Sequence, residues 1–149
     1  MKERVFLMLK PDAIEGKLIG KIIGRVEKEN LIILGLRLVK PETRKIEAWY
    51  RQKDDLSKKI YPPMRVIVRY LVRGPILLTV WEGEKALKKI RKIVGDGTEP
   101  KKCEAGSIRR DYGIDTLEKA TEEKRAIENL VHASRSLQTA KREIAFWFE

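Results

Sequence analysis

The stretch "RVFLMLKPD", residues Arg4–Asp12, decides the fold that we expect for this chain. It is a short apolar run that is stopped by Pro11 and Asp12, which predicts a buried strand. Lys10 stands at the end of this strand, a sound place from which to direct an ammonium group into a cleft. Taken alone, Lys10 is better explained as a strand-terminating surface lysine.

Further apolar segments alternate along the chain with segments of helical periodicity. Leu31–Val39 and Ile76–Trp81 predict two more strands, and a brief fourth strand is expected at Asn129–His132. Apolar residues at helical spacing, or a capping residue, predict the helices around them. These helices are expected at Leu18–Asn30, at Arg44–Gln52 after Thr43 as N-cap, at Met64–Arg73, at Glu84–Val94, in part of Thr116–Glu128 and at Leu137–Phe148.

This order of elements predicts an α/β (α+β) fold of ferredoxin type, with a four-stranded antiparallel sheet covered by helices. A parallel, doubly wound sheet is the alternative, although four short strands are few for it. We expect the stretch from Gly95 to about Asp115 to be irregular. In the last helix, one face is expected to carry Leu137, Ala140, Ile144 and Trp147.

Length and composition limit what the protein can be. A chain of 149 residues suits one compact domain, so we expect a single domain over residues 1–149. No apolar run is long enough to span a membrane, and the N-terminal segment lacks the pattern of a signal peptide. One cysteine, Cys103, cannot form an intrachain disulfide, and with one histidine it cannot make a usual structural zinc site. We therefore expect an intracellular, cytoplasmic protein.

The net charge of +11 favours partners that carry phosphate, without choosing among nucleic acid, nucleotide and membrane surface. Most lysines, including the pairs Lys88-Lys89 and Lys101-Lys102, are better explained as solvated surface groups. No phosphate-binding loop is present: Glu15–Leu18 lacks the Ser/Thr and the first glycine of a P-loop, and Gly95–Pro100 does not follow a strand. Scattered side chains would therefore have to bind any phosphate.

The single histidine, His132, lies in "NLVHASRS", residues Asn129–Ser136. A lone histidine is more often structural than functional, but this one ends a strand and is followed by small residues. Ser134 or Ser136 can cap the next helix, whose N-terminus would favour phosphate. An imidazole there can attack phosphorus directly, because one ring nitrogen is nucleophilic at neutral pH. Glu143, on that helix, is a candidate partner for the other nitrogen.

"GSIRRDY", residues Gly106–Tyr112, places two arginines in the irregular stretch. The guanidinium group pairs well with phosphate oxygens. A structural salt bridge, for example between an arginine and Asp111, is the alternative, and this motif alone does not decide between them.

Taken together, these segments resemble the nucleoside diphosphate kinase family, and in particular its archaeal members. Any one of the matches is weak, but five in the family's order, spread from end to end, are highly specific. The matching segments are Phe6–Asp12, Gly74–Gly83, Gly106–Arg109, Asn129–Ser134 and Glu143–Phe148.

The resemblance implies a ping-pong phosphotransferase that moves the γ-phosphate of ATP or another nucleoside triphosphate to a nucleoside diphosphate through a phosphohistidine. It implies Mg²⁺ as cofactor, broad base specificity and a homo-oligomer, a hexamer or tetramer; membrane and nucleic acid are not required, and no residue is assigned as a metal ligand. The implied catalytic residues are His132, Glu143, Ser134 and Tyr50. The implied nucleotide-binding residues are Lys10, Arg91, Thr98, Arg109, Asn129 and Tyr61, the last as the residue that stacks on the base.

The chain departs from the family pattern at Arg135, where the family has an aspartate. We expect Arg135 to turn toward solvent or to pair with a carboxylate. The family's stacking phenylalanine has no clear counterpart, so Tyr61 is assigned by position, with Met64 and Ile67 also available. A stacking clamp reads little of the base edge, which predicts broad base tolerance.

Three other hypotheses remain at the level of sequence. The charge would suit a nucleic-acid binder, although aromatic and basic residues do not alternate on one strand as they do in RNA-binding sheets. Arg135 would suit a family member that kept the fold and lost catalysis. A nucleophilic pair of Cys103 and His132 is supported only by the presence of both residues.

Overall fold

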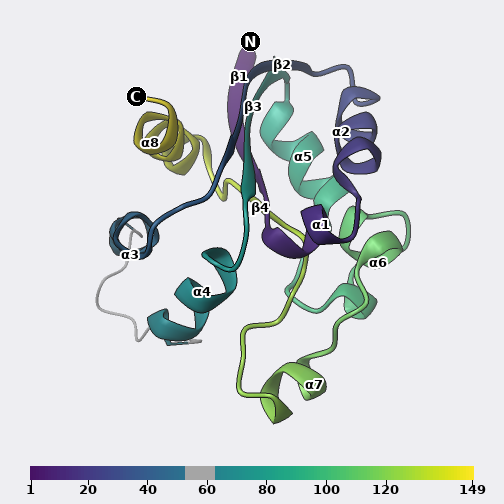
Figure 1. The fold of residues 1–149 in the computed structure, drawn as a ribbon. Coiled ribbons are helices and arrows are strands. Elements are labelled where there is room, and N and C mark those ends of the chain that lie inside the picture. Colours follow the sequence, from purple (N-terminus) through teal and green to yellow (C-terminus); the bar gives the residue numbers. More distant parts are fainter. Residues whose placement is uncertain (53–62) are drawn as a thin grey trace.

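The computed structural model describes residues 1–52 and 63–149. An antiparallel four-stranded sheet in the order β2-β3-β1-β4 forms its centre (Figure 1). The predicted fold class is confirmed, and the parallel alternative is wrong because every pair of neighbouring strands runs antiparallel. The strands are β1 (Lys2–Leu9), β2 (Ile32–Val39), β3 (Ile76–Glu84) and β4 (Val131–Ala133).

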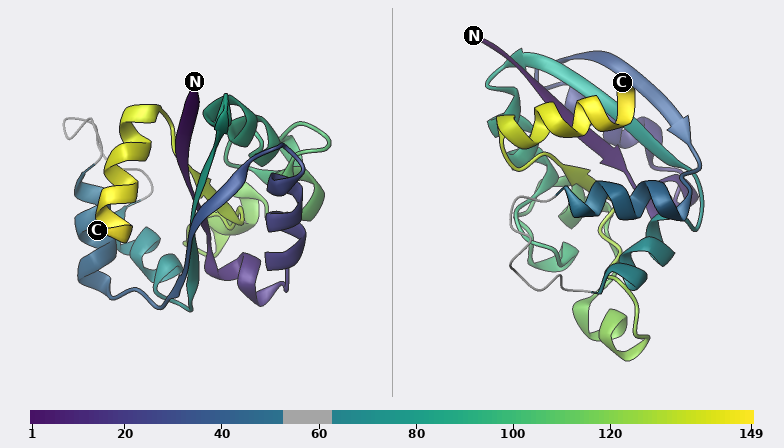
Figure 2. Two further views of the ribbon diagram at one scale, coloured as in Figure 1. Left: turned by 90° about the horizontal axis from the view of Figure 1, so that it is seen from above. Right: turned by 90° about the vertical axis from the view of Figure 1, so that its left-hand side faces the viewer.

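Helices cover both faces of this sheet, as the view from above shows (Figure 2). They are α1 (Pro11–Glu15), α2 (Ile19–Glu27), α3 (Thr43–Arg51), α4 (Met64–Leu71), α5 (Ala86–Val94), the 3-10 turn η1 (Pro100–Lys102), α6 (Ile108–Tyr112), α7 (Leu117–Glu122) and α8 (Leu137–Phe148). In the described part of the chain, no helix is both long enough and apolar enough to cross a membrane.

Strand β1 is apolar throughout its second half because both of its faces are buried. Alternate side chains of a strand point to opposite faces of the sheet. Val5, Leu7 and Leu9 pack into one core with α2 and α5, while Phe6 and Met8 pack into a second core with α3, α4 and α8. Strand β1 therefore lies between the two helical layers.

Pairing with β1 also fixes the position of the histidine. In the register of β1 and β4, His132 lies opposite Met8 and Ala133 lies opposite Leu7. Lys10 follows directly at the end of β1, and its backbone N–H donates to the carbonyl of Leu130 over 2.8 Å. Two segments far apart in sequence thus meet at one end of the sheet.

One local prediction is wrong, and two are refined. Thr43 does not cap α3: Glu42 precedes the first helical residue, and no side chain caps the helix. Leu137 opens α8 and is 41% exposed, whereas Ala140 and Trp147, farther along the predicted face, are buried. The stretch expected to be irregular contains η1 and α6.

Candidate active site

His132 and Glu143 face each other between β4 and α8. The histidine Nε2 and the Glu143 Oε2 are 2.5 Å apart. The side chain of Glu143 is 6% exposed, whereas that of His132 is 25% exposed. A carboxylate that is buried to this degree needs strong hydrogen bonds, and here the imidazole supplies one of them.

Ser134 supplies the second hydrogen bond to this carboxylate. Its hydroxyl donates to Glu143 Oε1 over 2.9 Å and accepts from the backbone N–H of Phe6 over 3.1 Å. Ser134 does not cap α8, since the N-cap is Ser136, whose hydroxyl accepts from the N–H of Thr139. Both oxygens of Glu143 are therefore held, and its orientation toward the ring is fixed.

The contact with Glu143 selects a tautomer for the imidazole. A carboxylate that accepts from Nε2 keeps the ring hydrogen on that nitrogen, so Nδ1 carries the lone pair. The ring of Trp49 meets the imidazole edge-on, with centroids 4.9 Å apart and an interplanar angle of 90°. The ring of His132 is thus held by a hydrogen bond and by packing, which leaves Nδ1 as the nitrogen that offers a lone pair.

Tyr50 lies beside Trp49 on α3, with ring centroids 5.2 Å apart. Burial, and to a lesser degree the charge of Glu143, raises the pKa of Tyr50 to about 12. The phenol is therefore protonated at neutral pH and can donate a hydrogen bond. Trp49 was missed at the level of sequence, where its only signal is that it precedes Tyr50 in a helix.

Lys10, Asn129 and Thr98 meet although they come from three separate segments. The ammonium group of Lys10 donates to Asn129 Oδ1 over 2.8 Å. Asn129 is buried, and its amide nitrogen donates to the backbone carbonyl of Thr98 over 3.0 Å. The structure brings these three predicted residues together, with Thr98 contributing its backbone and an exposed side chain.

Two arginines, Arg91 and Arg109, donate hydrogen bonds to the segment Asn129–Ser134, which contains the histidine. Arg91, on α5, donates to the carbonyl of Ser134 over 3.3 Å. Arg109, on α6, donates to the carbonyls of Asn129 and Val131 over 3.3 and 2.7 Å. Together with Lys10, they place three cations on the segment of six residues that contains the histidine. A cluster of cations around one nucleophile suits the binding of phosphate groups.

Two glycines of the stretch predicted to be irregular, Gly95 and Gly97, orient Arg109. Its guanidinium also donates to the carbonyls of Gly95 and Gly97, over 3.1 and 2.8 Å. Both glycines have positive φ angles of 104° and 98°, which other residues rarely adopt. Burial lowers the pKa of Arg109. A salt bridge of Arg109 with Asp111 is wrong, because Asp111 pairs with Arg25 over 2.8 Å.

Asp12, which is half-buried, and Tyr70, which is buried, form a pair that the sequence did not indicate. Asp12 Oδ1 accepts from the hydroxyl of Tyr70 over 2.6 Å, and Oδ2 accepts from the N–H of Leu130 over 3.1 Å. Leu130 has a φ of 75°, unusual for a leucine, and the carboxylate holds it there. The ammonium of Lys10 lies 5.4 Å from the centroid of the Tyr70 ring. In the sequence, Asp12 was marked only by its position directly after Lys10 and Pro11, at the end of the first strand.

The remaining predicted positions give a mixed result. Arg135 is exposed, as expected. Tyr61 lies outside the described residues.

Within residues 1–52 and 63–149, no group of three His, Cys, Asp or Glu side chains is arranged to hold a metal ion. The thiol of Cys103 is buried, donates to backbone carbonyls of Gly97 and Glu99, and has a pKa that burial raises.

Comparison with known proteins gives one consistent result. The sequence model of the family "Nucleoside diphosphate kinase" matches residues 3–149. A nucleoside diphosphate kinase of Pyrobaculum aerophilum is 37% identical, and the match covers 98% of this chain and 94% of the relative. Nucleoside diphosphate kinase 1 of Arabidopsis thaliana is also 37% identical, with 98% of this chain and 87% of the relative covered.

Solved structures agree with the sequence matches. The crystal structure of an NDP kinase from Pyrobaculum aerophilum superposes with a TM-score of 0.87 at 33% identity, covering 100% of this chain and 97% of that one. A nucleoside-diphosphate kinase from Borrelia burgdorferi, solved as a transition-state mimic with vanadate and ADP, superposes with a TM-score of 0.90 at 26% identity, covering 99% of this chain and 88% of that one. The chain belongs to the nucleoside diphosphate kinase family.

Proposed function

We propose that His132 carries the phosphoryl group in the reaction of this family, the transfer of a γ-phosphate from a nucleoside triphosphate to a nucleoside diphosphate. In the first half, Nδ1 forms a bond to the γ-phosphorus while the bond from that phosphorus to the β–γ bridging oxygen breaks. The nucleoside diphosphate leaves with the bridging oxygen. In the second half, a terminal oxygen of another nucleoside diphosphate attacks the phosphohistidine and restores the free imidazole.

The 2.5 Å contact of His132 Nε2 with Glu143 is the observation that carries this proposal. The ring gains positive charge as Nδ1 bonds to phosphorus, and a buried carboxylate at Nε2 stabilises that charge. Because Ser134 holds the other oxygen, the carboxylate needs no reorganisation during transfer. Phosphoryl transfer depends mostly on positioning and on neutralising charge, which this arrangement supplies.

The cations around the segment of His132 would bind the phosphates. Lys10, Arg91 and Arg109 each donate to that segment and are the groups on hand to offset the phosphate charge. The protonated hydroxyl of Tyr50 would donate to the phosphoryl group during transfer. Asn129 and Thr98 would contact the sugar and phosphates, and Tyr61 is kept as the proposed base-stacking residue.

Mg²⁺ would enter with the nucleotide as part of the substrate. Magnesium commonly binds through substrate phosphates with few protein carboxylates and several waters. The described residues offer no cluster of three metal-ligating side chains, and the predicted phosphate site is lined by cations. The residues therefore suit a triphosphate that brings its own metal.

The competing hypotheses are less well supported. A catalytically impaired member is not favoured, because the histidine, its carboxylate and the three cations are all in place. The family match likewise does not favour a nucleic-acid binder. A cysteine nucleophile is disfavoured because burial raises the pKa of the Cys103 thiol and so suppresses the thiolate.

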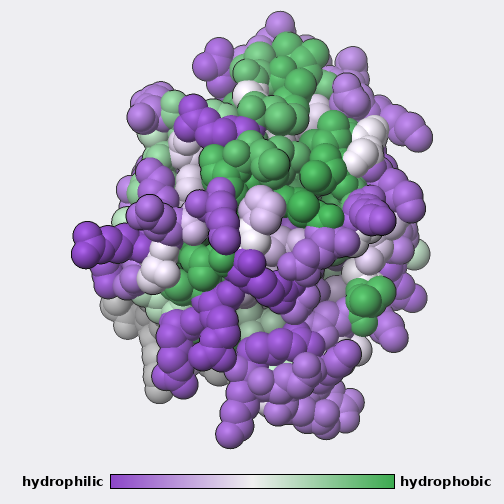
Figure 3. Space-filling model, in the orientation of Figure 1, coloured by the Kyte–Doolittle hydropathy of each residue, from purple (hydrophilic) through white to green (hydrophobic). Residues whose placement is uncertain are grey.

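A second copy of the chain is the proposed occupant of the exposed face of β2. This strand lies at the edge of the sheet. Figure 3 shows a hydrophobic area over this part of the molecule, and a long exposed apolar edge strand favours pairing with another chain. We also propose a homo-oligomer, expected by resemblance to be a hexamer or tetramer, together with a cytoplasmic location and a single domain over residues 1–149. The exposed apolar side chains of β2 are Ile32, Ile33, Leu34, Leu36 and Leu38.

Labelled ATP tests the proposed role of His132. Incubation of the wild type with γ-labelled ATP and Mg²⁺ should leave acid-labile, base-stable label on the protein, and any nucleoside diphosphate should remove it. His132→Ala should take up no label, whereas Arg135→Ala, at an exposed position, should label like the wild type. Label on His132→Ala would show that another residue carries the phosphoryl group.

A further inference from the structure

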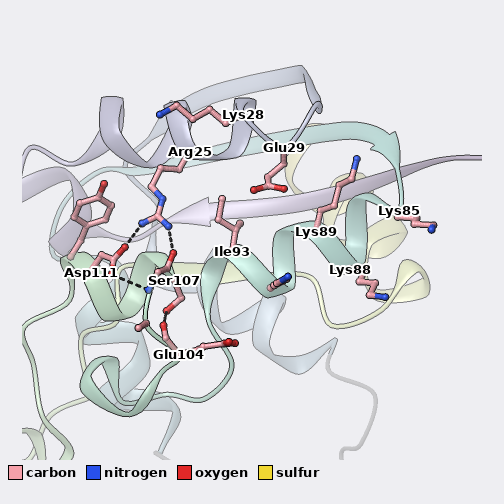
Figure 4. A pocket seen from close by; sticks show the side chains of 14 residues that line it. Arg25, Lys28, Glu29, Lys85, Lys88, Lys89, Ile93, Glu104, Ser107 and Asp111 are labelled. Atoms are coloured by element: carbon pink, nitrogen blue, oxygen red, sulfur yellow. Dashed lines mark hydrogen bonds and ion pairs between the residues drawn. The ribbon is translucent and has the colours of Figure 1, made fainter.

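A hollow of about 730 Å³ lies between α2, α5 and the segment that leads into α6 (Figure 4). None of the candidate active-site residues lines it. Its walls carry six basic side chains and three acidic ones. The basic residues are Arg25, Lys28, Lys85, Lys88, Lys89 and Lys92.

Three of these lysines, Lys88, Lys89 and Lys92, lie on α5, and Lys85 directly precedes this helix. Positions 88, 89 and 92 have the spacing that places side chains on the same side of a helix. Like charges at this spacing destabilise a helix. In the described part of the chain, none of the four makes an ion pair within 4.0 Å. The helix thus carries a row of uncompensated charge that its own stability does not explain.

Lys85 adds a second, independent observation. It precedes α5 with a φ of 52°, in the left-handed region where glycine or asparagine is usual. The carboxylate of Glu3 accepts from the N–H of Leu87 over 3.0 Å, so this side chain, and not Lys85, satisfies the helix start. The strained backbone places the Lys85 ammonium group at one end of the row (Figure 4).

The opposite wall is held in place by Arg25. Its guanidinium donates to Asp111 Oδ2 over 2.8 Å and to the carbonyl of Gly106, which ties α2 to α6 and to the segment before α6. This pair leaves five lysines, namely Lys28, Lys85 and the three on α5, against two carboxylates, Glu29 and Glu104. The hollow therefore carries an excess of positive charge after its internal ion pair is subtracted.

We propose that this hollow is a second anion site that binds a linear oligophosphate, either free or as the phosphate chain of a nucleotide. A row of ammonium groups matches successive phosphates better than a single compact anion. The volume falls in the range of sites for small ligands. The site lies apart from His132 and does not depend on the proposed phosphotransfer. Glutamine at positions 88 and 92, both exposed, removes charge with little expected effect on the fold.

Calorimetric titration of the full chain with sodium tripolyphosphate tests this site. The wild type should bind two equivalents per chain, one at the cations around His132 and one in the hollow. Lys88→Gln/Lys92→Gln should lose one equivalent or bind it at least roughly tenfold more weakly. A charge-matched control, Lys40→Gln/Lys119→Gln, changes exposed lysines on other elements and should retain both. Thermal melting of each variant should show an unchanged fold.

Further arms of the titration identify the source of the phosphates. Equal binding of tripolyphosphate and ATP at the second site would mean that only the phosphate chain is read, and tighter binding of ATP would mean that the nucleoside contributes. Tripolyphosphate binding to Lys88→Gln/Lys92→Gln with the stoichiometry and affinities of the wild type would overturn the proposal. A single equivalent on the wild type that this double variant loses would still place the anion in the hollow. Binding of a single-stranded oligonucleotide at the hollow with no binding of either small anion would also overturn it.

Discussion

At the scale of single residues, the charge of Glu143 is the feature on which catalysis should depend most. Glu143→Gln keeps an oxygen that can accept from His132 Nε2 and an amide that can face Ser134, so the geometry should survive while the charge is lost. We expect kcat to fall about 10²-fold, because the carboxylate no longer stabilises the positive ring. Rapid-quench measurement of the phosphorylation step would check this.

The control for that substitution is Ser134→Ala, which keeps the charge of Glu143 and removes one of its two hydrogen bonds. It should reduce the rate less than Glu143→Gln does. A Glu143→Gln variant that phosphorylates at the rate of the wild type would contradict the electrostatic role of the carboxylate.

Asp12 is predicted to be a positioning residue for the phosphate site. Asp12→Asn can accept from only one of the two donors, Tyr70 and Leu130, and presents an amide group to the other. Leu130 lies between Asn129 and strand β4, which carries His132, so a shift of Leu130 would misplace both residues. We therefore expect kcat/KM for nucleotides to fall about tenfold. Tyr70→Phe removes only one hydrogen bond and should have a smaller effect. If both variants kept the kcat/KM of the wild type, a positioning role of Asp12 would be excluded.

At the scale of helices and strands, most of the fold could be predicted because its signals are local. The apolar run of β1 and the 3.6-residue periodicity of α5 lie within single windows of sequence. The N-cap position of Glu42 before α3 and the exposure of Leu137 could not be predicted in this way. Periodicity fixes the direction of a side chain, but another element decides whether that side chain is covered.

The candidate site could also be predicted only where its residues have a local sequence signal. His132, Glu143, Lys10 and Arg109 could be named from motifs, since each lies in a segment typical of the family. Arg91 was assigned from the resemblance although it lies outside those segments. The contact between Asp12 and Tyr70 joins residues 58 positions apart and has no local signal. Trp49 was missed for the same reason, since its packing against the imidazole depends on how α3 meets β4.

The segment around α7 gives an element-scale prediction. Asp115 accepts from both terminal nitrogens of Arg125, over 2.6 and 2.9 Å, and from the N–H of Glu128. Burial alone would raise the pKa of Asp115, but Arg125 and the N–H of Glu128 lower it below its usual value. Asp115→Asn should therefore lower the free energy of unfolding at neutral pH by about 2 kcal/mol.

The pH dependence of that loss follows from the direction of the shift. A depressed pKa contributes stability above the unfolded value of about 3.8, and this contribution disappears as the pH falls through the folded value. Denaturant titrations should show wild type and Asp115→Asn differing at pH 7 and converging in strong acid. A difference that is constant with pH would mean that the charge of Asp115 is not its cause.

At the scale of the whole molecule, the exposed apolar strand β2 predicts self-association. Leu36 and Leu38 are 57% and 58% exposed. Leu36→Lys/Leu38→Lys would place two charges on this edge, which should shift the protein toward the monomer in analytical ultracentrifugation. Lysine substitution of Ile114, which is 88% exposed but lies outside β2, is the control. A monomeric wild type, or an unchanged oligomer in the double variant, would contradict this role of β2.

The measurement that tests the central claim most directly is the identification of the phosphorylated nitrogen. Because the chain has one histidine, a sample labelled with ¹⁵N-histidine and phosphorylated by ATP contains one imidazole to observe. The contact of Nε2 with Glu143 predicts that ³¹P–¹⁵N coupling appears at Nδ1 of His132. Coupling at Nε2 would contradict the account, because phosphorylation there would require the contact with Glu143 to be broken.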